Sequence, residues 1–162
     1  MSVTSVPPDA ESAPGRSLIL GRFAPYRIVA LGHAISGRLA RAYAGENLTI
    51  PEWRVLAVVA QADALAARDV VGKTPMDKMT VSRAVASLEG KGVIVRLQSE
   101  ADRRVNMLSL SKSGRALFDR VAVLALGFED ELLAGLSADE RAAFDQLLTK
   151  LEARVQTVGD AG

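Results

Sequence analysis

The stretch from Met76 to Arg104 constrains this chain most, because a helix pattern is followed at once by a hairpin pattern. In residues 76–91, four apolar residues recur at the spacing of one buried helical stripe: Val81, Ala84, Val85 and Leu88. Residues 93–98 and 104–110 are rich in strand-forming residues, and a polar segment lies between them. The pattern therefore predicts a helix over 76–91 and a hairpin over 93–110.

The outward face of this predicted helix contains no carboxylate. On an ideal helix it carries small or hydroxyl side chains and one arginine: Met79, Thr80, Arg83, Ala86 and Ser87. A solvated face normally mixes lysine and glutamate, whereas arginine and hydroxyls can contact guanine and phosphates in a DNA major groove. A short exposed helix with a few hydroxyls would have the same pattern, so the helix alone leaves both interpretations open.

The tip of the predicted hairpin concentrates charge. Asp102, Arg103 and Arg104 follow one another, and Arg96 flanks them. An aspartate can hold a neighbouring arginine in one rotamer by a charge-assisted hydrogen bond, and an arginine on a hairpin suits a narrow minor groove. Alone, an ordinary solvated turn would explain these residues better. Helix and hairpin together favour DNA binding.

The charge distribution agrees with this interpretation. The net charge of the 162 residues is only +1, but residues 68–120 contain eleven Lys/Arg and six Asp/Glu. Residues 121–162 contain three and eight, and residues 1–67 contain six and five. Positive charge is therefore concentrated on the helix-and-hairpin segment, as expected of a nucleic-acid contact.

The segments before residue 76 predict a tail and three helices. Residues 1–16 are rich in Ser, Pro and Ala without periodicity, which predicts disorder. A long helix is expected over 17–44, with Pro25 at its effective start or at a kink. Thr49 can cap a helix over 51–62, with Glu52 at a capping-box position. A short helix over 65–71 follows, so the helices up to residue 91 form a helix-turn-helix.

Two long helices are expected after the hairpin. Ser111 can cap the first, which runs to about residue 134, and Ser137 with Glu140 forms a capping-box pattern for the second. Each has an apolar stripe that would ordinarily be intramolecular core. However, long helices flanking a small domain have little of their own chain to bury against, so a second copy is the expected partner.

Other functional classes find little support. The chain has no cysteine and one histidine, His33, which excludes thiol chemistry and a multi-histidine metal site within one chain. No nucleophile-elbow or phosphate-binding glycine motif is present. We expect no enzyme, no cofactor and no metal, although carboxylate-only chemistry stays open. No apolar run reaches the ~18 residues of a membrane span, and no secretion signal is visible, which predicts a cytoplasmic protein.

Four segments together resemble the multiple-antibiotic-resistance regulator (MarR) family: LTIPEWRVL at 48–56, TVSRAVASL at 80–88, Lys91–Gly92, and ADRRVNMLSLSKSG at 101–114. The resemblance follows the order and spacing of most of residues 20–155. Its most specific part is the wing pattern, which consists of Asp102, Arg104, Leu110, Ser111 and Gly114. Residues 69–75 depart from the family pattern, which leaves the contact positions near them open.

The resemblance implies a mainly α fold, an α+β winged helix-turn-helix with six or so helices and a two-stranded hairpin wing. The expected partners are double-stranded operator DNA and a second copy. Residues 48–110 would bind DNA, and residues 17–47 and 111–157 would form a helical dimerisation region. Carried over residue by residue, the implied DNA contacts are Lys78, Thr80, Ser82, Arg83, Asp102, Arg103 and Arg104.

The family also places an effector pocket between the first helix and the DNA-binding part. Arg27, His33 and Trp53 are the candidates here, although Trp53 could be a core anchor and His33 a structural histidine. The segment MDKMTVSRAV is similar to the corresponding segment of family members that control the breakdown of hydroxycinnamate-type compounds. We therefore expect a repressor released by a small aromatic acid or its CoA thioester. A DNA-binding dimer without any effector is the alternative.

Overall fold

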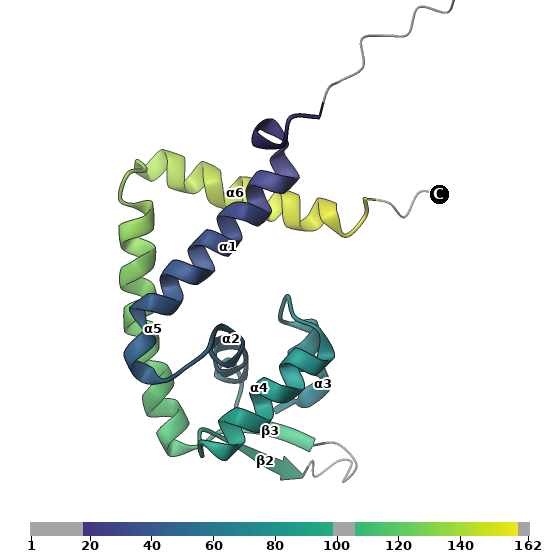
Figure 1. Cartoon of the computed structure of the whole chain (residues 1–162), viewed down its shortest axis with the longest axis vertical. Coiled ribbons are helices and arrows are strands. Elements are labelled where there is room, and N and C mark those ends of the chain that lie inside the picture. Colours follow the sequence, from purple (N-terminus) through teal and green to yellow (C-terminus); the bar gives the residue numbers. More distant parts are fainter. Residues whose placement is uncertain (1–17, 99–105, 159–162) are drawn as a thin grey trace, which may run out of the picture. The chain divides into compact units, whose positions relative to one another are not determined.

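The computed structural model describes residues 18–98 and 106–158. These residues divide into two compact units, with the boundary after Ile35, inside the first long helix. The elements, in chain order, are η1 (Leu20–Arg22), α1 (Ala24–Ala42), η2 (Ala44–Glu46), α2 (Ile50–Val59), β1 (Leu65–Ala66), α3 (Ala67–Gly72), α4 (Lys78–Gly90), β2 (Ile94–Gln98), β3 (Asn106–Leu110), α5 (Lys112–Leu133) and α6 (Ala138–Val155) (Figure 1). This mainly helical fold with a small antiparallel sheet confirms the predicted fold class. The predicted N-terminal tail, 1–16, lies outside the described residues.

The first long helix starts later than residue 17. α1 begins at Ala24, and the residues before it form the short 3-10 helix η1. Pro25 is therefore the second residue of α1, where its missing N–H removes no hydrogen bond of the helix. Pro25 was expected either at the start of the helix or at a kink, and it lies at the start.

Side-chain caps begin most of the long helices, and three of them are as predicted. Thr49 and Ser137 form capping boxes with Glu52 and Glu140 at the starts of α2 and α6. Ser111 caps α5 by accepting from the Gly114 N–H. Each cap satisfies an amide that has no partner inside its helix.

The sheet contains one strand more than the sequence predicted. The expected helix over 65–71 begins only at Ala67, because Leu65 and Ala66 form β1 and pair with Leu108 and Met107 of β3. The strand order is β1-β3-β2, and β2 pairs with β3 from Ile94↔Leu110 to Gln98↔Asn106. Two residues are too few for an alternating pattern, so only the pairing with a distant strand identifies β1.

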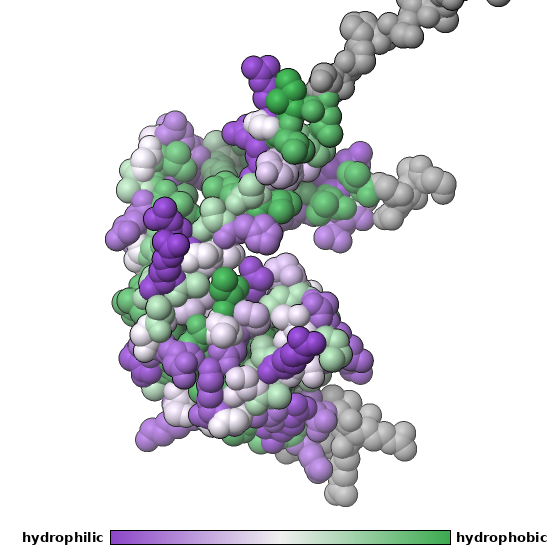
Figure 2. Space-filling model, in the orientation of Figure 1, coloured by the Kyte–Doolittle hydropathy of each residue, from purple (hydrophilic) through white to green (hydrophobic). Residues whose placement is uncertain are grey.

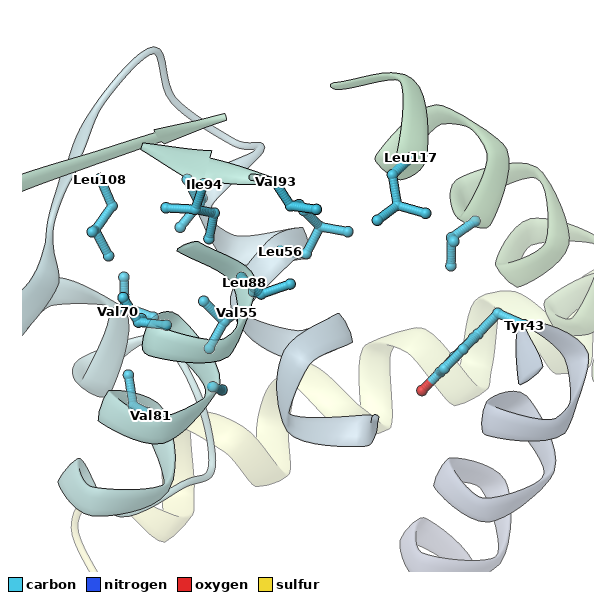
Figure 3. Close-up of a cluster of buried hydrophobic side chains, with 14 residues drawn as sticks. Tyr43, Val55, Leu56, Val70, Val81, Leu88, Val93, Ile94, Leu108 and Leu117 are labelled. Atoms are coloured by element: carbon cyan, nitrogen blue, oxygen red, sulfur yellow. The ribbon is translucent and has the colours of Figure 1, made fainter. Parts of the chain in front are cut away.

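One hydrophobic core joins α2, α3, α4, the sheet and the start of α5 (Figure 3). The stripe predicted for α4 is buried as expected. The largest core side chains are almost fully enclosed; they include Tyr43, Leu56, Leu88, Ile94 and Leu108. This core fixes the inner face of α4 and leaves its outer face to solvent.

The junctions on either side of the hairpin are tightly built. At the end of α4, Gly92 has φ +69°, and the N–H groups of Gly92 and Val93 donate to the carbonyls of Glu89 and Leu88. This Schellman motif stops the helix and starts β2. At the other junction, a Cβ on Gly114 would clash with the carbonyl oxygen of Val93. The first turn of α5 can therefore approach the hairpin this closely only because residue 114 is a glycine.

Several helices expose apolar side chains along much of their length. α1 and α6 are described throughout, and neither contains a buried residue. Figure 2 shows hydrophobic side chains at the surface where Figure 1 draws α6 and the first turns of α1. On α6 these are Phe144, Leu147, Leu148, Leu151 and Val155. No described helix combines the length and the apolar composition that a membrane span requires.

Candidate nucleic-acid interface

The outward face of α4 is the candidate interface. Arg83, Ala86 and Ser87 are exposed on it, and Lys78 and Ser82 are exposed along its edge. No Asp or Glu occurs in α4 before Glu89. Among the described residues, Arg83 forms no ion pair. The structure therefore brings Lys78, Ser82 and Arg83 together on one exposed surface.

Thr80 differs from the other predicted contacts on this helix. Its side chain is half-buried, and its hydroxyl donates to Asp77 Oδ2 at 2.7 Å while its N–H donates to Oδ1 at 2.8 Å. These hydrogen bonds lower the pKa of Asp77. Asp77 is thus the N-cap of α4, a role that was not predicted from the sequence. Thr80 stabilises the start of the helix besides being a predicted contact.

A buried carboxylate holds the opposite end of α4. Glu52, on α2, is 3% exposed, and its Oε1 accepts from Ser87 Oγ at 2.6 Å and from Lys91 Nζ at 2.7 Å. Its Oε2 accepts from the Thr49 N–H at 2.7 Å. Burial would raise the pKa of Glu52, but hydrogen bonds from Lys91, Ser87 and Thr49 lower it to about 2. The ionised carboxylate therefore links α2 to α4.

This link was not visible in the sequence. Glu52 was identified only as a capping-box residue and Ser87 only as an outward hydroxyl. The pairing joins residues 35 and 39 positions apart. The signal in the sequence was the single acid of a mainly apolar helix, because a buried carboxylate needs a partner.

Arg96, which flanks the predicted hairpin tip, is also held by a carboxylate. Its Nε and Nη2 donate to the two oxygens of Glu89 at 2.7 and 2.9 Å. The hydrogen bonds from Arg96 to Glu89 raise the pKa of the guanidinium. This bidentate pair connects β2 to α4. It also borders a groove of about 390 Å³ lined by Ala67, Arg68, Val71, Lys78, Val81, Ser82, Val85 and Arg96.

The other predicted site residues fall in three places. Asp102, Arg103 and Arg104 lie outside the described residues. Arg27 and His33 are exposed on the part of α1 that belongs to the first unit. Trp53 belongs to the second unit, where it packs against the core between Tyr43 and Phe118, with ring centroids 5.8 and 6.0 Å away. Trp53 therefore packs as a core anchor, which was one of the two roles considered for it.

Metal-binding geometry is absent from the part of the chain that the structure describes. No three side chains among its His, Asp and Glu residues cluster closely enough to hold a metal ion.

Comparisons with known proteins agree with the geometry of this domain. Residues 46–105 match the family model described as "MarR family". An HTH-type transcriptional regulator of Bacillus subtilis, YdgJ, is 26% identical over 104 residues, which cover 64% of this chain and 63% of YdgJ. The alignment thus spans less than two thirds of that relative.

Solved structures share the fold. A MarR/EmrR family transcriptional regulator from Acinetobacter sp. ADP1 has a TM-score of 0.79 and 25% identity, covering 87% of this chain and 100% of the other. The repressor CouR bound to a 23-mer DNA duplex has a TM-score of 0.74 and 24% identity, covering 88% and 99%. CouR from Rhodococcus jostii RHA1 bound to p-coumaroyl-CoA has a TM-score of 0.72 and 18% identity, covering 90% and 98%.

Proposed function

We propose, from the premise that residues 46–105 form a MarR-family domain, that this protein is a homodimeric transcriptional repressor. It binds a palindromic operator and is released by a small aromatic acid or its CoA thioester. One observation carries the DNA-binding part: α4 buries one face completely and exposes Lys78, Ser82 and Arg83 on a face without carboxylates.

The roles of these side chains follow from their chemistry. Lys78, in the first turn, contacts a phosphate as a point charge. Ser82 reaches a phosphate or a base edge, and Arg83 reads guanine through its two parallel N–H donors. The predicted wing residues Asp102, Arg103 and Arg104 would enter the adjacent minor groove. The hydrogen bonds of Ser87 and Lys91 to Glu52 hold the C-terminal end of α4 against α2, and the Asp77 cap stabilises its first turn. Both preserve the spacing of these contacts.

The dimer is proposed from the apolar surfaces of the terminal helices. α6 exposes a stripe of five large apolar side chains and buries none of them. A helix with such a stripe is stable when another surface covers it. The predicted dimerisation region, 17–47 and 111–157, contains this stripe and the exposed apolar residues of α1. A two-fold dimer presents two copies of α4, which explains a palindromic operator.

The effector is proposed from two lines of support. The segment around α4 resembles regulators of hydroxycinnamate breakdown, and CouR of known structure binds p-coumaroyl-CoA. Arg27, His33 and Trp53 are the proposed ligand contacts, since they supply a cation, an imidazole and an aromatic ring. The effector releases DNA by binding more tightly to a dimer form whose α4 helices are wrongly spaced. A DNA-binding dimer without any effector is the alternative.

The DNA-binding proposal is tested by in vitro selection from a randomised duplex library with the full chain, together with light scattering for its mass. We expect a dimer and a palindrome whose half-sites are about one helical turn apart. A monomer at micromolar concentration, or equal affinity for all duplexes, would contradict the proposal.

The effector is tested on the selected duplex with hydroxycinnamates, benzoates and their CoA thioesters. A true effector weakens DNA binding and changes the emission of Trp53, which is the single tryptophan of the chain. If no compound weakens binding at millimolar concentration, the aromatic effector is wrong and the DNA-binding dimer without an effector is favoured.

A further inference from the structure

Met79 is the most outward side chain of α4, and no packing among the described residues explains its presence there. It is 60% exposed. At about 100° per residue, it lies opposite the centre of the buried stripe formed by Val81, Ala84, Val85 and Leu88. It does not belong to the core of the described residues or to the side chains packed against it.

The neighbours of Met79 define the surface it presents. Ser82 and Arg83 follow it at i+3 and i+4, so they adjoin it on the helix surface. Ala86 follows one turn later and is small. Met79 is therefore a long apolar side chain in the middle of a face whose other side chains are hydroxyl-bearing, cationic or small.

The major groove of DNA contains one apolar group that suits such a side chain. Thymine alone among the four bases carries a methyl group, at C5, on its major-groove edge. The unbranched thioether of methionine adapts to irregular apolar surfaces. An exposed methionine beside an arginine can thus read a thymine next to the base that the arginine reads.

We propose that Met79 is a specificity-determining residue that contacts the 5-methyl group of one thymine in each half-site. The inference rests on the proposed function and adds one base contact to the proposed recognition of the operator. Four residues along a helix span about 6 Å, and base pairs are about 3.4 Å apart. The thymine therefore lies within about two base pairs of the guanine contacted by Arg83.

The experiment uses the full-length protein and the duplex recovered by in vitro selection, in which each thymine is replaced singly by uracil. Uracil lacks only the 5-methyl group. We expect one position per half-site where the replacement weakens binding by about three- to fivefold, the effect of losing one apolar carbon contact. In Met79→Ala, binding to the original duplex is weakened by a similar factor, and the uracil at that position has no further effect.

Two control variants separate methyl recognition from a general loss of affinity. Met79→Leu keeps an apolar side chain and retains the sensitivity to uracil. Lys78→Ala weakens binding to all duplexes alike and also retains it. Because Met79 is exposed, Met79→Ala should unfold at the same urea concentration as the wild type.

The outcomes distinguish this inference from the proposed function. If a palindrome is selected but uracil has no effect at any position, or has the same effect in Met79→Ala, then Met79 does not read thymine and the repressor proposal stands. A selected site that contains no thymine would also show that Met79 does not read thymine, and the repressor proposal would stand. If no duplex is preferred, the proposed function is wrong and this inference fails with it.

Discussion

The Glu52 carboxylate and the Lys91 ammonium lie 2.7 Å apart, although the two residues are 39 positions apart in the chain. Lys91 also donates to the Asn47 carbonyl at 2.8 Å, and Ser87 adds a second hydrogen bond to the same oxygen of Glu52. The C-terminal end of α4 is therefore held against α2 and the turn before it. At the other end, the Asp77 cap stabilises the first turn of the proposed recognition helix.

Replacing Glu52 should destabilise the domain. In Glu52→Gln the Lys91 ammonium loses its charged partner in a partly buried position, so the free energy of unfolding should fall by about 2–4 kcal/mol. Urea unfolding at pH 7 measures this change. Glu46→Gln is the matched control, because Glu46 pairs with Arg120 at the surface, where water screens the pair, and its loss should be much smaller. Equal losses in the two variants would contradict the anchoring role of Glu52.

The same carboxylate should make stability depend on acid pH. The pKa of Glu52 is about 2 in the folded chain, below its ordinary value of 4.5. The ionised form thus stabilises the fold fully above about pH 5, by on the order of 3 kcal/mol, and this contribution is lost as the pH falls through 4.5 towards 2. Unfolding measured from pH 7 to pH 3 should show a shallower decline in Glu52→Gln than in the wild type. Parallel curves would show that Glu52 does not titrate with this low pKa.

Two glycines of α5 should respond oppositely to alanine. Gly114→Ala places a methyl group against the Val93 carbonyl, so the hairpin or the helix must move, at a cost of about 2–4 kcal/mol. A methyl group on Gly127 would meet no neighbouring atom of the described residues within 4 Å, so Gly127→Ala should stabilise the helix by about 0.5–1 kcal/mol. Thermal unfolding of both variants tests the pair. A neutral Gly114→Ala would rule out the close approach of α5 to the hairpin.

Arg83 and Arg104 should affect DNA binding differently. Arg83→Ala should weaken binding and relax base preference at one position per half-site, because a bidentate arginine–guanine contact contributes about 1–3 kcal/mol of discrimination. Arg104→Ala should weaken binding severely without changing the preferred bases. Competition against a series of base-substituted duplexes distinguishes the two effects. A uniform loss of affinity in Arg83→Ala would show that Arg83 contacts only the backbone.

The apolar stripe of α6 should control the oligomeric state. Leu151 is 53% exposed within one chain, so Leu151→Arg should place a charge in the proposed interface and convert the dimer to a monomer at micromolar concentration. Lys150→Ala, one residue away and off the stripe, should leave the dimer intact. Light scattering measures the mass of each variant. A dimeric Leu151→Arg would exclude α6 from the interface.

The sequence alone determined the features that depend on neighbouring residues, namely helical periodicity and helix caps. The stripe of α4 follows from helical periodicity, and the caps at Thr49, Ser111 and Ser137 follow from side-chain hydroxyls placed just before a helix. These features depend on residues three or four positions apart, so they can be predicted without knowing the fold. The outward face of α4 was predictable for the same reason.

Contacts between distant residues were decided only by the tertiary structure. β1 exists because Leu65 and Ala66 pair with β3, and Gly114 is required because the Val93 carbonyl lies against it. The ionised state of Glu52 depends on Ser87 and Lys91, which are distant in the chain and meet it only after α2 packs on α4. Periodicity and capping follow from local backbone geometry, whereas strand pairing, close approach and the pKa of a buried group depend on which distant segments the hydrophobic core brings together.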